Sequence, residues 1–357
     1  MTNFLLKKLT YGILVIAGVV TVVFFLFNIL PGDPARMMLG QRADVASIEN
    51  INRELGRDKS LAFQFALFVN DLSTLSIHKQ SDKGSPWFAS EDKYGSFLTV
   101  ISPGSYAVVI KTPYLRRSYQ TKQLVSEVIS DAMPGTIILA IAALIFAAVF
   151  GIALGVLAAL KKNKLTDYLV SMLAVLGMAV PSFFAGIIIA WVFGFVLADY
   201  TGFNMTGSLY RIDPFEGFVL ELRNLVLPAF TLGIRPLSVI VQLTRSSMLD
   251  VLSQDYIRTA KAKGLSKNIT VFRHALRNAL NPVLTAVSGW FGSLLAGAVF
   301  IEYIFGWKGI GKVTVDSLER YDFPVVMGAV LVVSIFFVII NIVVDILYGM
   351  LDPRIRI

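Results

Sequence analysis

Five stretches of this chain run for about 20 residues or more without a charged side chain. A helix needs about 20 residues to cross the hydrocarbon core of a bilayer, which is about 30 Å thick. The stretches are residues 9–32, 132–160, 168–198, 278–301 and 323–344. A sixth, residues 224–244, has the same length but contains Arg235 near its middle. The pattern predicts an all-α polytopic membrane protein with six transmembrane helices.

The composition agrees with a membrane protein and excludes several other classes. Hydrophobic residues make up 55% of the chain and charged residues 16%, whereas soluble domains average about 45–50% and about 25%. The chain has no cysteine, which excludes disulfide scaffolds, thiolate metal sites and thiol catalysis. The net charge is +8. In a membrane protein this excess reflects orientation, so no nucleic-acid partner is expected.

Lysine and arginine in the short loops predict the orientation, because basic residues resist translocation. They concentrate on the side that holds both termini, so both termini are expected to be cytoplasmic.

The first span is predicted to be an uncleaved helix, because its apolar core is longer than the about 7–15 residues of a signal peptide. The loop at residues 33–125 is expected to form a small extracytoplasmic module. It has an amphipathic helix at residues 61–69 and short strands and turns at residues 84–119.

The loop between the fourth and fifth spans, residues 245–281, is called the basic loop below. Ser253 is predicted to be an N-cap, and Asp255 suits the positive end of a helix. Two lysines suit the negative end just before Gly264, which is expected to end the helix in a left-handed conformation. These signals predict a short helix over residues 254–263.

A second helix is expected to follow in the same loop. Ser266 offers its N-cap, and the helix is expected to run towards Asn281 and Pro282, where the fifth span begins. A short helix held between two membrane helices would move both of them when it is pushed.

The same stretches resemble one family of membrane proteins. The basic loop reads DYIRTAKAKGLS at residues 255–266 and RHALRNALNP at residues 273–282. Together they closely resemble the cytoplasmic loop of peptide-type ABC importer permeases. Other matching stretches are LPGDPAR at 30–36, VPSF at 180–183, LTRSSML at 243–249 and LDPR at 351–354. The resemblance covers most of the chain, except for an insertion at about residues 79–119.

The basic loop departs from the pattern of the wider importer superfamily. Arg258-Thr-Ala260 stands where that pattern begins with Glu-Ala-Ala, and His274-Ala-Leu-Arg277 stands where it ends with Ile-x-Leu-Pro. Gly264 stands at the glycine position of the superfamily pattern. The peptide-type branch of the superfamily resembles this chain at the two substituted stretches. The alternative to this family resemblance is that the basic loop is simply a basic amphipathic segment that lies on anionic lipid.

The resemblance implies a type I importer permease in the bacterial inner membrane, surrounded by membrane lipid. Its expected parts are residues 1–32 (tail and first helix), 33–125 (module), 126–350 (permease core) and 351–357 (cytoplasmic tail). The implied partners are a second homologous permease subunit, two cytoplasmic ATPase subunits and an extracytoplasmic substrate-binding protein. The chain itself is expected to be no enzyme and to hold no cofactor, because ATP would be bound and hydrolysed by the partner subunits.

In this family the basic loop docks on an ATPase. The residues predicted to take part are Tyr256, Ala260 and Leu265 for buried contacts, Arg258, Thr259 and Lys263 for the rest of the docking surface, and Gly264 for the turn.

Two residues within spans are candidates for a substrate pathway. A charge inside a span costs about 2.5–3.5 kcal/mol, and a water-lined pathway would relieve that cost for Arg235. The alternatives for Arg235 are a structural pair with another helix, or local unwinding at Pro236 that lets the side chain reach the membrane surface. Pro181 lies in the middle of the third span and frees a backbone carbonyl. It is therefore predicted either to kink a pathway-lining helix or to be merely tolerated there.

Other motifs have simpler interpretations. The spacing from Gly306 to Lys312 matches a phosphate-binding loop, but Val313 stands where Ser or Thr should hold magnesium, so an external loop is expected instead. Glu302 beside it is expected to be a cap at the membrane surface. A GxxxG motif at residues 151–155 permits close helix approach, for subunit pairing or for packing within the chain.

Three other function classes are less consistent with the sequence. An ion-coupled secondary transporter would need carboxylates within its spans, and the six stretches contain neither Asp nor Glu. An intramembrane hydrolase would need a base or a metal cluster, but the only histidines, His78 and His274, are predicted to lie on opposite sides of the membrane. A membrane anchor subunit would not explain Arg235. The identity of a transported solute is left open.

Overall fold

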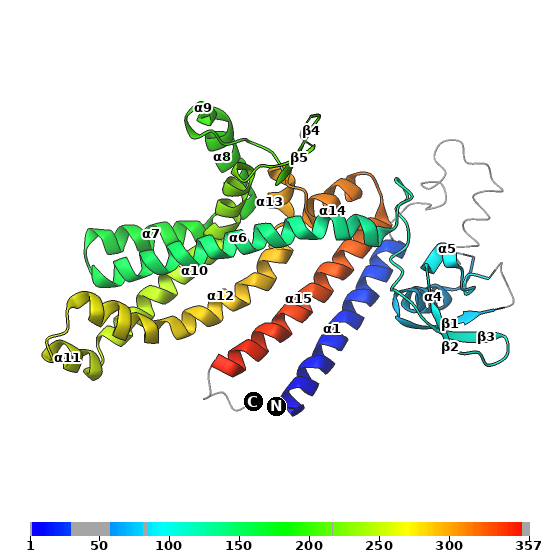
Figure 1. The fold of residues 1–357 in the computed structure, drawn as a ribbon, viewed down its shortest axis with the longest axis horizontal. Coiled ribbons are helices and arrows are strands. Elements are labelled where there is room, and N and C mark those ends of the chain that lie inside the picture. The colour runs from blue at the N-terminus through cyan, green and yellow to red at the C-terminus, as the bar shows by residue number, and fades with distance from the viewer. Residues whose placement is uncertain (1, 30–57, 81–84, 216, 352–357) are drawn as a thin grey trace. The chain divides into compact units, whose positions relative to one another are not determined.

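The computed structural model describes residues 2–29, 58–80, 85–215 and 217–351 (Figure 1). These residues divide into two compact units. The core unit is built mainly from Ala132–Lys312, and the module unit is built from Leu6–Asp131 together with Val313–Ile335. The family-like stretches at residues 30–36 and 352–354 lie outside the described residues, as does the tail that follows.

Five of the described helices are long and apolar enough to cross a membrane, and one bent pair makes a sixth span. The five contain the helices α1 (Thr2–Ile29), α6 (Val125–Leu160), α10 (Arg223–Leu252), α12 (Arg277–Gly297) and α15 (Phe323–Leu351). This confirms the predicted six-span, all-α membrane architecture. The helices extend beyond the charge-free stretches, because the flanking polar residues continue the same helical hydrogen bonding.

Glycines allow α6 and α10 to pack closely in the core unit. A Cβ on Gly151 would lie 2.8 Å from the Cγ2 of Ile240, and a Cβ on Gly155 would lie 2.6 Å from the Cβ of Thr244. Both distances are too short for a side chain, so only glycine permits this approach. The GxxxG motif therefore serves packing within the chain, which decides between the two alternatives left open by the sequence.

The third span is broken rather than continuous. The helices α7 (Leu165–Ala179) and α8 (Ser182–Trp191) meet at 108°. Val180 is extended, with φ −76° and ψ 128°, because the ring of Pro181 disfavours the helical conformation in the residue before it. Of the two alternatives left open for Pro181, the structure supports the kink, and the bend is a full break. The π-helix η2 (Val192–Val196) and the short α9 (Ala198–Thr201) follow.

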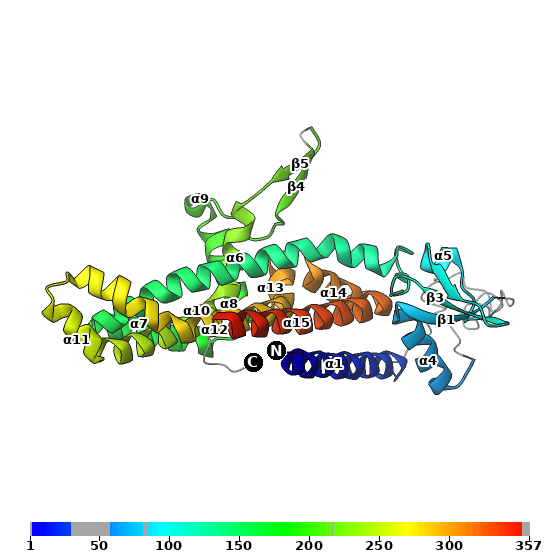
Figure 2. The same ribbon diagram turned by 60° about the horizontal axis from the view of Figure 1, so that its bottom comes forward.

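A β-hairpin precedes α10, at the end of the spans opposite the basic loop. Its strands β4 (Tyr210–Asp213) and β5 (Gly217–Leu220) pair antiparallel, and the hairpin stands away from the core helices in both ribbon views (Figures 1 and 2). Phe215 near its tip is 96% exposed and Phe218 is 78% exposed. Such large exposed aromatic side chains are typical of a surface that meets a partner.

Two short helices, α13 (Val299–Ile304) and α14 (Ile310–Glu319), follow α12. Oε2 of Glu302 accepts hydrogen bonds from the backbone N–H groups of Gly311 (2.7 Å) and Lys312 (3.2 Å) at the start of α14. Glu302 is therefore a helix cap, as predicted, and its side chain is fully buried within the chain. The N–H groups that would bind a phosphate are occupied by this carboxylate, which argues against a nucleotide site.

The module unit contains α4 (Leu61–Leu72), the short α5 (Glu91–Tyr94) and a three-stranded antiparallel sheet. The sheet has the order β1 (Leu75–Lys79), β3 (Tyr106–Ile110) and β2 (Leu98–Ile101). These elements confirm the predicted amphipathic helix and the predicted strands. The ring of Phe24 on α1 lies 5.1 Å from Phe65 and 5.6 Å from Phe68, both on α4. The module is therefore joined to the first span by aromatic packing.

A buried polar cluster lies on the inner side of this sheet. Oδ1 of Asp71 accepts hydrogen bonds from Nζ of Lys93 (3.0 Å) and from the hydroxyl of Tyr94 (2.7 Å). Nζ of Lys111 donates to the backbone oxygens of Asp71 (2.6 Å) and Ser73 (3.1 Å), and burial lowers the pKa of Lys111 to about 8. The charges are tolerated because each has partners.

His78 is fully buried in the same cluster. Its Nδ1 lies 3.2 Å from the backbone oxygen of Trp87 and its Nε2 lies 2.9 Å from Oγ of Ser76. A carbonyl oxygen only accepts, so Nδ1 carries the hydrogen in this arrangement. Burial lowers the pKa of His78 below its ordinary value of 6.5, so the folded module holds a neutral imidazole.

We expect the module to lose stability in mild acid for this reason. Below pH 6.5 the unfolded module binds a proton at His78 that the folded module does not bind, so stability falls as the pH falls. Hydrogen exchange of the β1 and β3 amides, corrected for intrinsic rates, should therefore show easier opening at pH 5 than at pH 7. A His78→Gln variant should lose this dependence and a His274→Gln variant should keep it. An unchanged dependence in His78→Gln would contradict this assignment.

Candidate functional site

The basic loop contains a short helix, α11 (Asp255–Ala262), as predicted to within one residue at each end. Its end is formed by Gly264, which has φ 78°, while the N–H of Leu265 bonds to the backbone oxygen of Ala260 at 3.3 Å. This is the hydrogen-bond pattern of a glycine-terminated helix. The predicted N-cap is wrong: Ser253 belongs to the end of α10, where its hydroxyl bonds to the backbone oxygen of Asp250 at 2.7 Å, and Gln254 occupies the cap position.

One face of α11 is buried against the ends of the neighbouring spans. Ile257 is fully buried and lies in a cluster with Met248 of α10 and with Val271 and Ala275 of the π-helix η3 (Ile269–Leu276). Burying one such aliphatic side chain stabilises the structure by about 1.5–3 kcal/mol. The hydroxyl of Tyr256 also accepts a hydrogen bond of 2.7 Å from the side-chain amide of Asn278 on α12. The short helix is thus fixed to both spans.

Ala260 lies on this buried face and is only 7% exposed. The prediction that it contributes a contact to a partner therefore needs correction, because its side chain is already covered within the chain. Sequence reasoning missed Ile257, which is the residue that holds α11 in place. The spacing of three residues between Ile257 and Ala260 marks one face of a helix, and that signal was available in the sequence.

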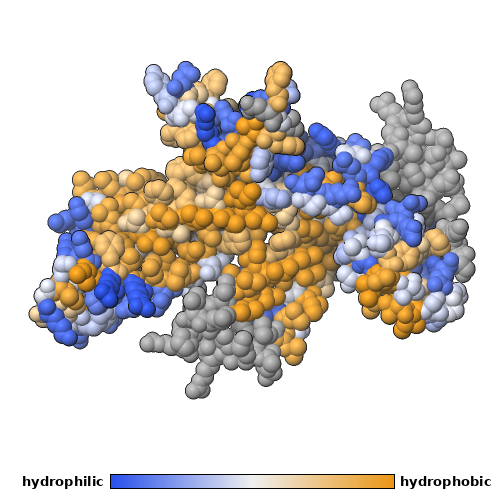
Figure 3. All heavy atoms as spheres, in the orientation of Figure 1, coloured by the Kyte–Doolittle hydropathy of each residue, from blue (hydrophilic) through white to orange (hydrophobic). Residues whose placement is uncertain are grey.

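The other face of the basic loop is exposed and combines apolar with basic side chains. Its apolar members are Tyr256 (40% exposed), Leu265 (36%), Ile269 (43%) and Phe272 (60%). The exposed basic and polar members include the predicted Arg258, Thr259 and Lys263. Figure 3 shows the blue, hydrophilic surface around α11 beside the orange surface of the spans. Four exposed apolar side chains gathered on one face indicate contact with another molecule.

The second helix of the basic loop continues into the fifth span without a break. Residues 269–297 form one 29-residue helix, with η3 passing directly into α12. The expectation that the fifth span begins at Pro282 is wrong, because Pro282 lies inside α12 and the helix continues through it. The continuous helix connects the exposed face of the basic loop to the interior of the membrane.

An ion pair that the sequence did not reveal joins α7 and α10 at the start of the basic loop. Nε and Nη2 of Arg245 bond to the two carboxylate oxygens of Asp167 at 2.5 and 2.8 Å. The Asp167 side chain is 3% exposed and that of Arg245 is 29% exposed. Two parallel hydrogen bonds make this a bidentate pair with fixed geometry. The residues are 78 positions apart, so no local pattern predicts the contact.

One face of α10 carries polar side chains within the membrane span. Arg235, Gln242, Ser246 and Asp250 are exposed in the isolated chain and follow one another at helical spacing; we call them the polar stripe. Among the described residues no carboxylate forms an ion pair with Arg235. The helix continues through Pro236, which argues against the alternative of local unwinding there. The structure therefore leaves Arg235 available to a molecule outside the chain.

A cavity of about 580 Å³ lies beside this stripe, between α7 and α10. Gln242 and Ser246 line it together with Ser171 and Met178 of α7, and the side-chain amide of Gln242 donates to the Met178 sulfur at 3.5 Å. Met178 lies just before the break at Pro181. The predicted pathway residues, Arg235 and Pro181, thus belong to two spans that pack against each other.

No group of three or more His, Asp or Glu side chains that could hold a metal is present in the part of the chain that the structure describes. The chemistry of the site is that of the polar stripe along α10, which leads at one end to the exposed face of the basic loop.

Comparisons with known proteins agree with this arrangement. Residues 151–357 match the family "Binding-protein-dependent transport system inner membrane component", and residues 1–90 match its N-terminal companion. The chain is 37% identical over 371 residues to the di/tripeptide transport system permease protein DppB of Pseudomonas aeruginosa, which covers 100% of this chain and 99% of that protein.

Two further relatives also align over the whole length of this chain. The chain is 33% identical over 370 residues to the dipeptide transport system permease protein DppB of Alkalihalophilus pseudofirmus, covering 100% of both. It is 35% identical over 357 residues to the glutathione transport system permease protein GsiC of Salmonella typhimurium, covering 100% of this chain and 99% of that protein. The chain therefore belongs to the family of binding-protein-dependent transport system inner membrane components, as a multi-pass membrane permease.

Proposed function

We propose that this chain is one permease subunit of an ATP-driven importer and forms half of its substrate pathway. A second homologous permease would complete the pathway, and two cytoplasmic ATPases would dock on the two permeases. The basic loop would be cytoplasmic, with the exposed side chains of Tyr256, Leu265 and Phe272 entering a groove of one ATPase. Closure of the ATPases on nucleotide would then push α11.

The observation that carries this proposal is the double attachment of α11. Ile257 joins it to α10 and η3, and Tyr256 joins it to α12. A push on the exposed face would therefore move the polar stripe of α10 and the long helix of residues 269–297 together. This supports conversion of a cytoplasmic movement into alternating access, which requires two discrete arrangements of packed helices.

The substrate class that fits best is a short peptide or a peptide-like solute. The relatives' names refer to dipeptides, tripeptides and glutathione. The polar stripe offers one guanidinium, one amide, one hydroxyl and one carboxylate along α10, and the first three groups suit carboxylates and peptide bonds. A binding protein outside the membrane would deliver the solute, and the hairpin with Phe215 and Phe218 is a suitable contact for it.

The proposal is tested by purifying the chain with its native partners and reconstituting the assembly. We expect a second permease and two ATPases to co-elute, and uptake to require ATP and a binding protein. Transport at full rate by this chain alone, driven by a proton or sodium gradient, would contradict the proposal and support a secondary transporter.

Sidedness is measured separately with single cysteines, since the chain has none of its own. Lys263→Cys and Phe215→Cys place a thiol on exposed residues at opposite ends of the spans. In intact cells a membrane-impermeant maleimide should label Phe215→Cys but not Lys263→Cys. Lys263→Cys should be labelled only after the membrane is permeabilised. The reverse result would overturn the orientation.

A further inference from the structure

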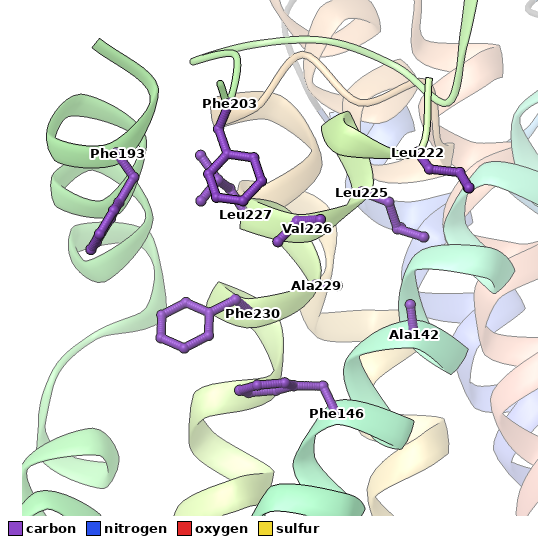
Figure 4. Close-up of a pocket in the computed structure, with 10 residues that line it drawn as sticks. All are labelled: Ala142, Phe146, Phe193, Phe203, Leu222, Leu225, Val226, Leu227, Ala229 and Phe230. Carbon is purple, nitrogen blue, oxygen red and sulfur yellow. The ribbon is translucent and has the colours of Figure 1, made fainter. Parts of the chain in front are cut away.

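An apolar pocket of about 440 Å³ lies in the core unit between α6, η2 and the first turns of α10. Four phenylalanine side chains line it: Phe146, Phe193, Phe203 and Phe230. Figure 4 shows Phe193 on one side of the space, with Phe203 and Phe230 facing it from the α10 side and Phe146 at its lower end. Ala142 and Leu222 complete the lining used below. Nothing in this set offers a polar side chain.

The depth of the pocket matches one leaflet of a bilayer. Its lining runs along α10 from Leu222 to Phe230, which is about 12 Å of helix. One leaflet contributes about half of a hydrocarbon core of about 30 Å. The pocket lies at the end of the spans opposite the basic loop, because α10 reaches that loop only at its other end.

The surroundings of the pocket are also apolar and exposed. Ile145 on α6 is 59% exposed, and Phe195 and Val196 on η2 are 66% and 53% exposed. These side chains belong to candidate membrane spans, so exposed apolar surface lies beside the pocket.

A positively charged residue directly follows the pocket lining in the sequence. Arg223 follows the lining residue Leu222, begins α10 and is exposed, and among the described residues it has no ion-pair partner. The nearby Arg211, in contrast, is engaged by Asp213 at 3.3 Å and by Glu221 at 3.5 Å. The start of α10 has no side-chain cap, and the N–H groups of Asn224 and Leu225 bond to the backbone oxygens of Glu221 and Leu222, both at 3.1 Å.

From this geometry we propose that the pocket binds one phospholipid of the leaflet opposite the basic loop, with an acyl chain among the four phenylalanines and its phosphate at Arg223. An acyl chain can be buried against this apolar lining without cost, whereas water or a peptide would lose hydrogen bonds there. The guanidinium provides the complementary charge for the head group. The site does not depend on the proposed import function, since it requires only that the chain lies in a membrane.

The test measures phospholipid retained by the purified native assembly after mild delipidation, by native mass spectrometry. An Ala142→Phe variant fills the pocket, and an Ile145→Phe variant adds the same ring one turn away on α6, outside the lining. We expect Ala142→Phe to retain one phospholipid fewer per chain, with at least about a tenfold loss of occupancy, and Ile145→Phe to match the wild type. Equal retention in wild type and Ala142→Phe would overturn the site.

The head group and the competing occupant are tested in the same assembly. In nanodiscs of mixed composition the wild type should prefer phosphatidylglycerol over phosphatidylcholine, and Arg223→Gln should lose that preference. An unchanged preference would overturn the assignment to Arg223. A phospholipid with a photoactivatable acyl chain should label the lining of the pocket, including Phe230. If the lining stays unlabelled while a bifunctional cross-linker joins the thiol of a Phe230→Cys variant to a second permease subunit, a protein fills the pocket and the proposal is overturned.

Discussion

In the proposed importer, a Gly264→Val variant is expected to insert into the membrane and assemble, yet to import solute at about a tenth of the wild-type rate or less while the ATPases still hydrolyse ATP. Gly264 has φ 78°, and a side chain there would meet no atom within 4 Å. The effect is therefore purely conformational. An L-residue in this region costs about 1–2 kcal/mol, and a β-branched one is the least tolerated. A difference of about 1.4 kcal/mol corresponds to a factor of ten.

The strain is expected to act on the exposed face of the basic loop. The chain can relieve it by giving up the hydrogen bond from Leu265 to Ala260, which changes the direction in which Tyr256 and Leu265 are presented. Ile257 stays buried on the opposite face of α11, so the fold of the core unit is not expected to change. The loss should appear in the ratio of solute moved to ATP hydrolysed, measured in proteoliposomes with the complete assembly.

Gly104→Val is the matched control for this variant. Gly104 lies between β2 and β3, has φ 66° and likewise has no atom within 4 Å of an added Cβ, so the same backbone strain is placed in the module unit. We expect Gly104→Val to retain the wild-type ratio of transport to hydrolysis. Normal uptake by Gly264→Val would show that the orientation of α11 does not transmit movement.

Local patterns predicted the elements that depend on neighbouring residues. Charge-free runs predicted the spans, and the glycine at position 264 predicted the end of α11, because a left-handed stop is a property of one residue. Pro181 made a bend in the third span one of two alternatives, since its ring acts directly on Val180. In each case the physical cause lies within a few residues of the effect.

Contacts between distant elements could not be predicted in the same way. The assignment of Ala260 to an outward contact failed because the face of α11 that is buried is decided by Met248 and Val271, which belong to other helices. The burial of Glu302 depends on the folding of α14 back onto it. Packing against other elements overrides local signals when a short helix has two faces of similar polarity.

The pair of Asp167 and Arg245 is the clearest contact of this kind, and its removal is expected to have the largest effect on stability. An Arg245→Ala variant leaves the carboxylate of Asp167, whose side chain is 3% exposed, without its guanidinium. Breaking such a buried pair costs about 3–5 kcal/mol, and we expect about 3 kcal/mol because Arg245 itself is 29% exposed. The variant chain, purified in detergent without its partners, should therefore unfold at a temperature several degrees lower than the wild-type chain.

Two companion variants separate the loss of the pair from a general effect of losing an arginine. Arg258→Gln removes the guanidinium of an ion pair with Asp255 that is open to water, with side chains 76% and 93% exposed, and no measurable change in the unfolding temperature is expected. The double variant Asp167→Asn with Arg245→Gln removes both charges. It should regain much of the stability lost in Arg245→Ala, because the cost arises from an unpaired buried charge. If the double variant were as unstable as Arg245→Ala, the lost stability would come from packing around the arginine side chain, and the buried charge would not be its cause.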